Sequence, residues 1–334
     1  MGTRITNLQT TDVLINQIFN RRTDLETIRQ QIASGTKVQV SSDDTGKAGT
    51  ILNLQSIITR VDRHKERISL VTSQLEHQQS TLSTADSILV RAKELATQAA
   101  NGSLSYQDRA LLGDEVFQIR DQLVALANTK YQGRYVYGGN DDGTQPFTAS
   151  TYTQSPTNTS DPAYSRYVYN TSAGAQATRT VDISDDTSVK VNTPGDDIFQ
   201  NSISALERLG RSLKGYRTTL GGTGLPNGLG TAYTQPADFA EQTHDIITAM
   251  DALDSARTND IIVEESDLGA RLNRIDQVSS ILDNLKTSTE TSRASLQDTD
   301  IFEASAKFSN LQSSLQALLA SGSQINSLSL LNYL

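Results

Sequence analysis

Residues 51–100 read ILNLQSIITRVDRHKERISLVTSQLEHQQSTLSTADSILVRAKELATQAA and contain neither proline nor glycine. One stripe at heptad spacing runs along the second part of this stretch, and nine of its ten positions are apolar: Ile68, Val71, Leu75, Gln78, Leu82, Ala85, Leu89, Ala92, Ala96 and Ala99. This spacing is typical of the seam of a helical bundle or coiled coil. At a rise of 1.5 Å per residue, an uninterrupted helix here is roughly 75 Å long. The sequence therefore predicts a helical rod.

Helical seams also occupy the two ends of the chain. Steps of three and four residues connect the N-terminal set, which is Leu14, Ile18, Arg21, Leu25, Ile28 and Ile32. Gly35 follows this set as a helix stop. Towards the C-terminus, Asp300 and Glu303 form a capping-box pattern. The stripe that begins there consists of Ile301, Ala304, Phe308, Leu311, Leu315, Leu318, Gly322 and Ile325.

An energetic comparison separates the terminal seams from the central one. Five large apolar side chains on the N-terminal seam contribute about 8–15 kcal/mol gross if they are fully buried. Ordering some 30 residues of backbone costs about 30 kcal/mol or more, and helical hydrogen bonds return only part of it. We therefore predict that both terminal seams are assembly interfaces, ordered when other copies of the chain complete the bundle. For residues 51–99, packing within one molecule is the preferred interpretation.

The composition changes abruptly at Tyr131, and Thr, Tyr, Ser and Asn dominate up to about Thr193. Apolar residues that alternate with polar ones on either side of residues 184–187 predict a β-hairpin; they are Val181, Ile183, Val189 and Val191. A further strand is indicated by Tyr164, Tyr167 and Tyr169. The sequence Asn-Asp-Asp-Gly at 140–143 is interpreted as a tight hairpin turn.

Apolar stripes return in four more stretches and predict helices at about residues 105–126, 196–213, 236–253 and 261–286. The first of these should fold back antiparallel on the rod. The predicted fold is mainly α: a long antiparallel helical bundle or coiled coil built from the N- and C-terminal segments, with a small β-rich inserted domain. We expect terminal coiled-coil segments at 1–40 and 295–334, a helical rod domain at 41–130 and 196–294, and the β-rich insertion at 131–195.

Composition and charge exclude several classes of function. Hydrophobic residues make up 36% of the 334 residues, which is low for one compact globule and favours thin packing along helices. The net charge of −9 disfavours both nucleic-acid binding and docking on anionic membranes. No run approaches the roughly 18 apolar residues of a membrane span, and we expect no Sec-type signal to be read. The absence of cysteine excludes a disulfide scaffold, a thiolate metal site and a cysteine nucleophile.

Candidate catalytic and metal-binding residues are few. The three histidines, His64, His77 and His244, form no i, i+4 pair, and we interpret His64 as a surface residue on a solvated helix face. Gly46-Lys47 resembles the end of a phosphate-binding loop, but the first glycine of that motif is missing. Residues 140–143 lack the alternating spacing of a calcium loop. We therefore predict no enzyme activity, no cofactor and no metal.

Several short motifs carry a resemblance to a known family. They are residues 32–38 (IASGTKV), 42–44 (SDD), 96–102 (ATQAANG), 126–128 (LAN), 133–139 (GRYVYGG), 268–274 (LGARLNR) and 328–334 (LSLLNYL). On these motifs the chain resembles the hook-associated protein 3 family, the FlgL-type junction proteins of the flagellin superfamily. The resemblance covers about residues 1–140 and 260–334.

The resemblance implies a structural adaptor at the hook–filament junction of the bacterial flagellum. It implies a homo-oligomeric layer that sits on hook-associated protein 1 and accepts flagellin, with the paired termini in an inner tube and the β insertion outside. It also implies export through the flagellar type III channel, without a cleaved signal. A FlgN-like chaperone would then hold the C-terminal helix at Ile301–Ile325.

Two alternatives stay open on the sequence alone. One is a flagellin, the bulk subunit of the filament, and the other is a secreted coiled-coil adhesin whose β insertion binds a ligand. Purified flagellin would polymerise on added seeds, whereas a junction protein would not. An adhesin mutant would swim normally.

Overall fold

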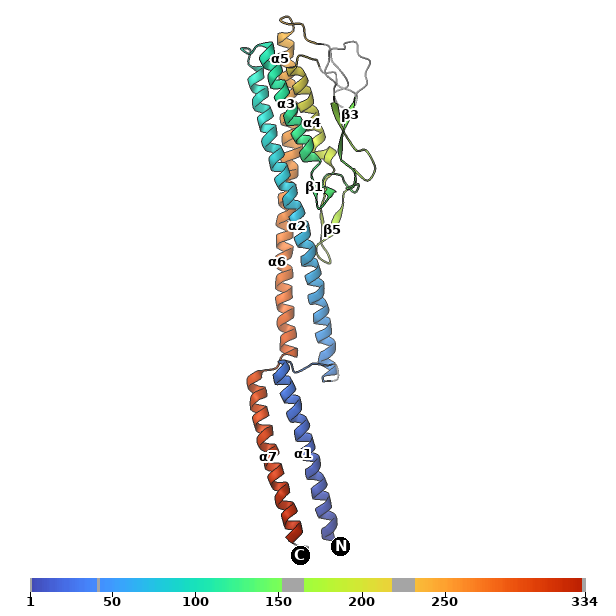
Figure 1. Cartoon of the computed structure of the whole chain (residues 1–334), viewed down its shortest axis with the longest axis vertical. Coiled ribbons are helices and arrows are strands. Elements are labelled where there is room, and N and C mark those ends of the chain that lie inside the picture. Colours follow the sequence, from blue (N-terminus) through green and yellow to red (C-terminus); the bar gives the residue numbers. More distant parts are fainter. Residues whose placement is uncertain (1, 41–42, 152–164, 218–231, 332–334) are drawn as a thin grey trace. The chain divides into compact units, whose positions relative to one another are not determined.

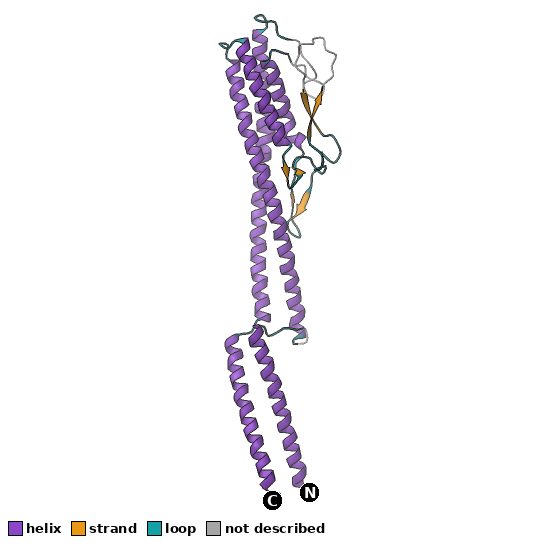
Figure 2. Ribbon diagram, viewed as in Figure 1, coloured by secondary structure: helices purple, strands orange, loops and turns teal. Residues whose placement is uncertain are grey.

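A computed structural model of the chain describes residues 2–40, 43–151, 165–217 and 232–331 (Figure 1). The helices are α1 (Gly2–Ser34), α2 (Thr45–Ala100), α3 (Tyr106–Ala127), α4 (Gly195–Leu213), α5 (Phe239–Ala256), a π-helical turn η1 (Arg257–Ile262), α6 (Val263–Gln297) and α7 (Ile301–Leu331). The strands are β1 (Lys130–Tyr131), β2 (Arg134–Tyr135), β3 (Phe147–Thr151), β4 (Ser165–Tyr169), β5 (Thr180–Asp182) and β6 (Ser188–Lys190). The predicted fold class, mainly α with a small β-rich insertion, is confirmed (Figure 2).

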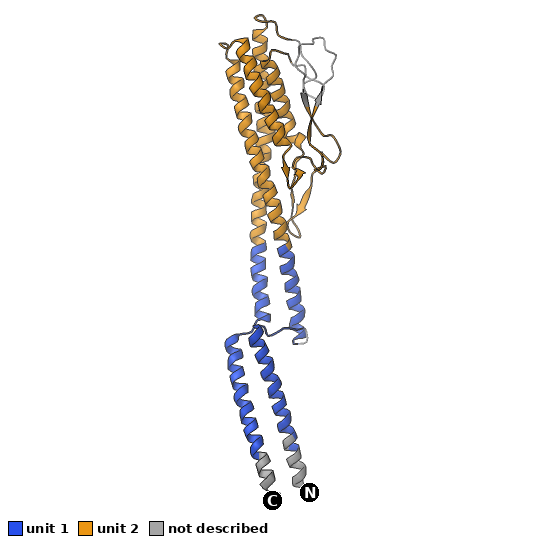
Figure 3. Cartoon of the chain, in the orientation of Figure 1, with its two compact units in different colours: residues 1–62, 282–334 blue, residues 63–281 orange. Residues whose placement is uncertain are grey.

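The described chain forms two compact units (Figure 3). One unit comprises residues 1–62 and 282–334, and the other comprises residues 63–281. The division of the chain into terminal segments, rod and insertion stays a prediction.

The predicted rod is the 56-residue helix α2. Its heptad stripe is the buried one: Leu75, Leu82, Ala85, Leu89, Ala92, Ala96 and Ala99 have no measurable exposure. Asp44 caps the helix, since its Oδ1 accepts a hydrogen bond from the backbone N–H of Lys47 at 3.0 Å. Ser105 caps α3, because its Oγ accepts a hydrogen bond from the backbone N–H of Asp108 at 3.2 Å.

Helix α4 is the centre of the second unit. It contacts both α3 and α5, and the four apolar residues expected on its stripe are buried: Ile203, Leu206, Leu209 and Leu213. The sequence predicts two helices at 236–253 and 261–286, but the structure connects them through η1. No proline or glycine occurs between Phe239 and Leu268, so nothing in the chain forces a stop there.

The insertion consists of three two-stranded antiparallel sheets beside the helices of this unit (Figure 2). The predicted hairpin is β5–β6, with Val181 opposite Val189. Tyr167 and Tyr169 lie in β4, paired with β3, while Tyr164 falls outside the described residues. An aromatic cluster joins the β3–β4 sheet to α4. The ring centroid of Phe147 lies 5.2 Å from that of Tyr169 in β4 and 6.5 Å from that of Phe199 in α4.

The interpretation of residues 140–143 as a hairpin turn is wrong. The strands on either side, β2 and β3, pair with β1 and β4 and not with each other. The segment is held by other loops: the Asn140 backbone N–H donates to the carbonyl of Gly174 at 2.7 Å. Asp141 Oδ2 accepts from Asn170 Nδ2 at 3.0 Å and from Ser172 Oγ at 3.1 Å. These bonds replace strand pairing.

Gly139 is the tightest point of this arrangement. Its φ is +64°, and a Cβ built there would lie 2.1 Å from the carbonyl oxygen of Ala175. Because both the backbone conformation and the space exclude a side chain, we expect Gly139→Ala to cost about 2 kcal/mol or more of folding free energy. Thermal unfolding should show a melting temperature lower by about 4 °C or more. Gly143→Ala, where the added Cβ meets nothing within 4 Å, is the control and should leave it unchanged.

Candidate assembly interface

Helices α1 and α7 contact each other along the predicted seams. They run antiparallel: a Cβ on Gly322, near the end of α7, would lie 3.0 Å from Cδ2 of Leu14, and Ile28 shares a groove with Leu311. The N-terminal seam residues that the structure places at half-burial are Leu14, Ile18, Leu25, Ile28 and Ile32. Those of α7 are Phe308, Leu311, Leu315 and Leu318. Their role in assembly stays a prediction.

Ile301 and Ile325 differ from the other residues of the C-terminal seam. Ile301 is 55% exposed, and Ala304, one turn later, occupies the buried position at 4%. The predicted role of Ile301 in assembly stays a prediction. The side chain of Ile325 lies outside the described residues.

The pairing of α1 with α7 buries little. Among the described side chains of these two helices, Ala304 is the one apolar side chain that is buried. A groove of about 530 Å³ runs between them, lined by Arg21, Asp24, Thr27, Ile28, Lys307, Asn310, Leu311 and Ser314. Half-buried leucines and isoleucines retain much of their apolar surface in water. Each Å² of that surface would contribute about 25 cal/mol of stabilisation if a neighbour buried it. The seam is thus an incomplete core.

A second set of apolar side chains lies on the outer faces of the same helices. On α1 they are Val13, Ile15 and Phe19, with exposures of 54%, 56% and 71%, and on α7 they are Phe302 and Leu319, with 90% and 53%. The sequence analysis missed them, because a heptad template selects the one stripe that faces one neighbour. The sequence does show these residues, as large apolar side chains at helical positions outside the heptad stripe. Together with the seam they make α1 and α7 apolar on more than one face.

Charge does little to hold the helix pair together. Each ion pair formed by the described residues of α1 and α7 joins two residues of the same helix. These pairs are Arg21–Asp24 at 3.6 Å and Arg29–Glu26 at 3.7 Å in α1, and Lys307–Glu303 at 2.6 Å in α7. Exposed i, i+3 and i, i+4 pairs of this kind contribute a few tenths of a kcal/mol each.

Backbone hydrogen bonds fix the junction between α1, α6 and α7. Lys37 N–H donates to the carbonyl of Gln297 at 2.8 Å, and Thr299 N–H donates to the carbonyl of Gly35 at 2.9 Å. Gly35 adopts φ +72°, the left-handed conformation expected after a helix. The two terminal helices therefore start from a defined connection although their own contact is thin.

His64 is placed differently from the prediction, whereas His244 is exposed. His64 is 5% exposed, and its ring contacts Asp185 Oδ1 at 3.1 Å and Arg67 at 2.9 Å, so its interpretation as a solvated surface residue is wrong. The reason is tertiary: the turn of the β5–β6 hairpin covers this face of α2. The described residues contain no group of three His, Cys, Asp or Glu side chains placed to hold a metal ion. Within the described part of the chain, no helix is long and apolar enough to cross a membrane.

Both ends of the chain match a known protein family. Residues 5–142 match the bacterial flagellin N-terminal helical region, and residues 250–334 match the bacterial flagellin C-terminal helical region. The chain belongs to the flagellin superfamily. Both of the predicted seams fall within these two flagellin regions.

Relatives within the superfamily include flagellar hook-associated protein 3 of Escherichia coli, which is 30% identical over 131 residues. That similarity covers 39% of this chain and 41% of the relative, so the chain matches less than half the length of this curated protein. The resemblance to hook-associated protein 3 is thereby confirmed.

Two solved structures share the fold. A flagellar hook-associated protein from Vibrio parahaemolyticus superposes with a TM-score of 0.59 at 18% identity, over 77% of this chain and all of that one. FlgL of Xanthomonas campestris gives 0.55 at 19% identity, over 72% of this chain and 98% of its own. At these identities the likeness concerns the fold.

Proposed function

We propose that the chain is a structural adaptor at the hook–filament junction of the bacterial flagellum, with no catalytic role. In this proposal it forms a homo-oligomeric layer that stacks on hook-associated protein 1 and accepts flagellin. The observation that carries the proposal is the α1–α7 pair, an incomplete apolar core made from the two flagellin-like regions of the chain. Copies that stack can bury the seam and the outer apolar faces, and head-to-tail stacking of identical subunits builds tubes.

Export is part of the same proposal. The chain would leave the cell through the flagellar type III channel as a largely unfolded polypeptide, with a FlgN-like chaperone on the apolar face of α7. The thin burial of α1 and α7 supports this, because segments with little buried surface are easily unfolded. The absence of cysteine supports it too, since no cross-link can obstruct threading.

Flagellin is the second candidate, because both matched regions are flagellin regions. Deletion of the gene separates the candidates. A junction protein predicts bare hooks in electron micrographs and unassembled flagellin in the culture medium, both reversed when the gene is supplied again. Loss of the filament without flagellin in the medium would identify a filament subunit instead, and normal swimming would contradict both candidates and favour the adhesin.

A further inference from the structure

Phe302 is an exposed anchor at the start of α7. Its side chain is 90% exposed, and Ile301 beside it is 55% exposed. The residue is nevertheless held in place, because Asp300 Oδ1 accepts from the backbone N–H of Phe302 at 2.9 Å and of Glu303 at 3.2 Å. These bonds fix the backbone at Phe302, while its ring lies in water, and aromatic side chains of this kind are enriched among the residues that dominate interfaces.

Carboxylates surround this anchor. Asp298 and Asp300 are exposed, while Glu303 forms an ion pair with Lys307 at 2.6 Å. The segment at residues 298–303, which we name the anchor segment, therefore presents the exposed carboxylates of Asp298 and Asp300, the latter also the cap of α7, beside two apolar side chains. Its complement is an apolar pocket with a cationic rim.

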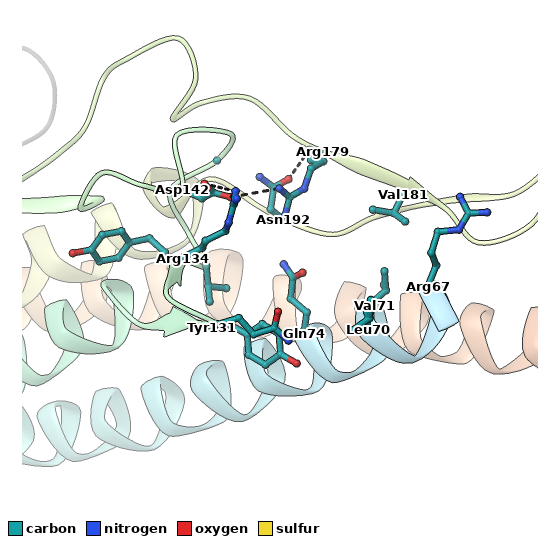
Figure 4. A pocket seen from close by; sticks show the side chains of 14 residues that line it. Arg67, Leu70, Val71, Gln74, Tyr131, Arg134, Asp142, Arg179, Val181 and Asn192 are labelled. Carbon is teal, nitrogen blue, oxygen red and sulfur yellow. Dashed lines mark hydrogen bonds and ion pairs between the residues drawn. The ribbon is translucent and has the colours of Figure 1, made fainter. Parts of the chain in front are cut away.

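Such a pocket lies in the second unit, between α2 and the insertion (Figure 4). Its volume is about 340 Å³, within the range of about 300–1,000 Å³ that ligand pockets occupy. Its apolar lining includes Leu70 of α2, Val181 of β5 and Tyr131 of β1, and Figure 4 shows Gln74 between Tyr131 and Leu70. Leu70 is 60% exposed, which places an uncovered leucine at the cavity.

Arginines form the rim of this pocket. Arg134 and Arg179 both approach Asp142, at 3.0 Å and 3.5 Å, and Arg67 extends from α2 (Figure 4). Asp142 is thus shared by two guanidinium groups, each of which carries five N–H donors. The side chain of Arg134 is 71% exposed and that of Arg179 is 42% exposed, so both are accessible to a partner. The rim is cationic in a chain whose net charge is −9.

We propose that this pocket receives the anchor segment of a second copy of the chain. The Phe302 ring enters the apolar part, and the carboxylates of Asp298 and Asp300 pair with Arg134 and Arg179. The contact joins different surfaces of the two copies, so it repeats from copy to copy without closing, as a stacked layer requires. It rests on the proposed function only in that copies of the chain must pack against one another.

Disulfide trapping tests this contact cleanly, because the chain contains no cysteine. One variant carries Phe302→Cys and a second carries Leu70→Cys, and the two are mixed in full-length form under mild oxidation over a concentration series. The matched control replaces Leu70→Cys by Leu111→Cys, a leucine with 69% exposure in the same unit that does not line the cavity. We expect the 302–70 heterodimer to form at least ten times faster than the 302–111 heterodimer.

The rim charges are tested from the side of the anchor. Asp298→Asn and Asp300→Asn remove the carboxylates, and asparagine at 300 still caps α7, so the helix start is retained. We expect these changes to slow the 302–70 reaction several-fold and added salt to do the same in the parent pair. The same measurement with Asp276→Asn and Asp283→Asn, two exposed carboxylates of α6, should leave the rate unchanged.

Three outcomes overturn the proposal. The first is an equal rate of disulfide formation for the 302–70 and 302–111 pairs. The second is a 302–70 rate that the Asp298→Asn and Asp300→Asn changes leave unaltered. The third is an intramolecular disulfide in a dilute chain that carries both the 302 and the 70 cysteine. The proposed function is judged separately, by a Phe19→Cys and Leu319→Cys pair on the outer faces of α1 and α7. Cross-linking there without cross-linking at the pocket leaves the adaptor in place and removes the anchor contact.

Discussion

A chain that carries Leu311→Asp and Leu315→Asp is expected to fold its central helices and to fail in assembly. Both leucines are half-buried on the α7 face that meets α1. Each substitution removes about 1.5–3 kcal/mol of stabilisation, which is what a leucine side chain contributes once packing against further copies has buried it fully. Because the loss is at least about 3 kcal/mol per subunit, the concentration needed for assembly should rise at least about 100-fold. Motility of the corresponding strain and sedimentation of the purified chain measure this.

The control for this variant places the same charges on a neighbouring, exposed face of the helix. Gln312→Asp and Gln316→Asp lie at exposed positions one residue further along α7. They add the same net charge without removing apolar surface, so their effect should be much smaller. Unchanged motility of the leucine variant, or equal effects of the two pairs, would refute the role of the seam. Circular dichroism should show that the second unit keeps its helices in both variants.

Arg120→Met is expected to destabilise the second unit more than any substitution of an exposed ion pair. Arg120 of α3 and Glu207 of α4 form a buried ion pair, with side-chain exposures of 9% and 4%. Removing the arginine leaves a buried carboxylate without this partner, a change that costs about 3–5 kcal/mol in other proteins. The melting temperature of this unit should fall by about 2–4 °C for each kcal/mol.

The pH dependence of this effect follows from Glu207. Burial raises the pKa of Glu207, and Arg120 counteracts that rise. Without Arg120 the pKa should rise further, so the folded state binds a proton more tightly than the unfolded state. The destabilisation of Arg120→Met is therefore largest at neutral pH and shrinks as pH falls towards the raised pKa. A destabilisation that grew on acidification would contradict this assignment.

Two further variants complete the test of the buried pair. Arg120→Met combined with Glu207→Leu removes both charges and should recover at least half of the loss, because apolar replacements of buried pairs are often tolerated. Arg91→Met, which breaks the exposed pair with Glu115 at 2.9 Å, should leave the melting temperature almost unchanged. A double variant as unstable as Arg120→Met alone would show that packing, and not charge, is responsible.

Local rules of sequence predicted the helical part of the fold. The cap at Asp300 forms the expected hydrogen bond with the backbone N–H of Glu303, and Gly35 takes the left-handed conformation typical of a helix stop. These signals are local, since a cap acts within its own helical turn. The heptad stripe of α2 was predictable for the same reason: the residues that repeat at helical spacing share one face.

Features that depend on distant segments escaped prediction. His64 is buried because a hairpin more than 100 residues later in the chain covers it, through Asp185. The turn at 140–143 is held by loop residues 170–174, so its own sequence did not reveal its partners. At the candidate interface, periodicity identified the seam but not Phe19 and Phe302, whose exposure depends on where α1 and α7 meet.

Hydrogen exchange of the free and the assembled chain measures directly whether the terminal helices depend on neighbouring copies. In dilute monomer we expect fast amide exchange at residues 1–35 and 300–334, against slow exchange in the buried stretch Leu75–Leu95 of α2, which serves as the internal reference. On assembly the terminal amides should become as protected as that reference. Slow exchange at both termini in the dilute monomer would contradict the proposal, because the α1–α7 pair would then be a complete core on its own.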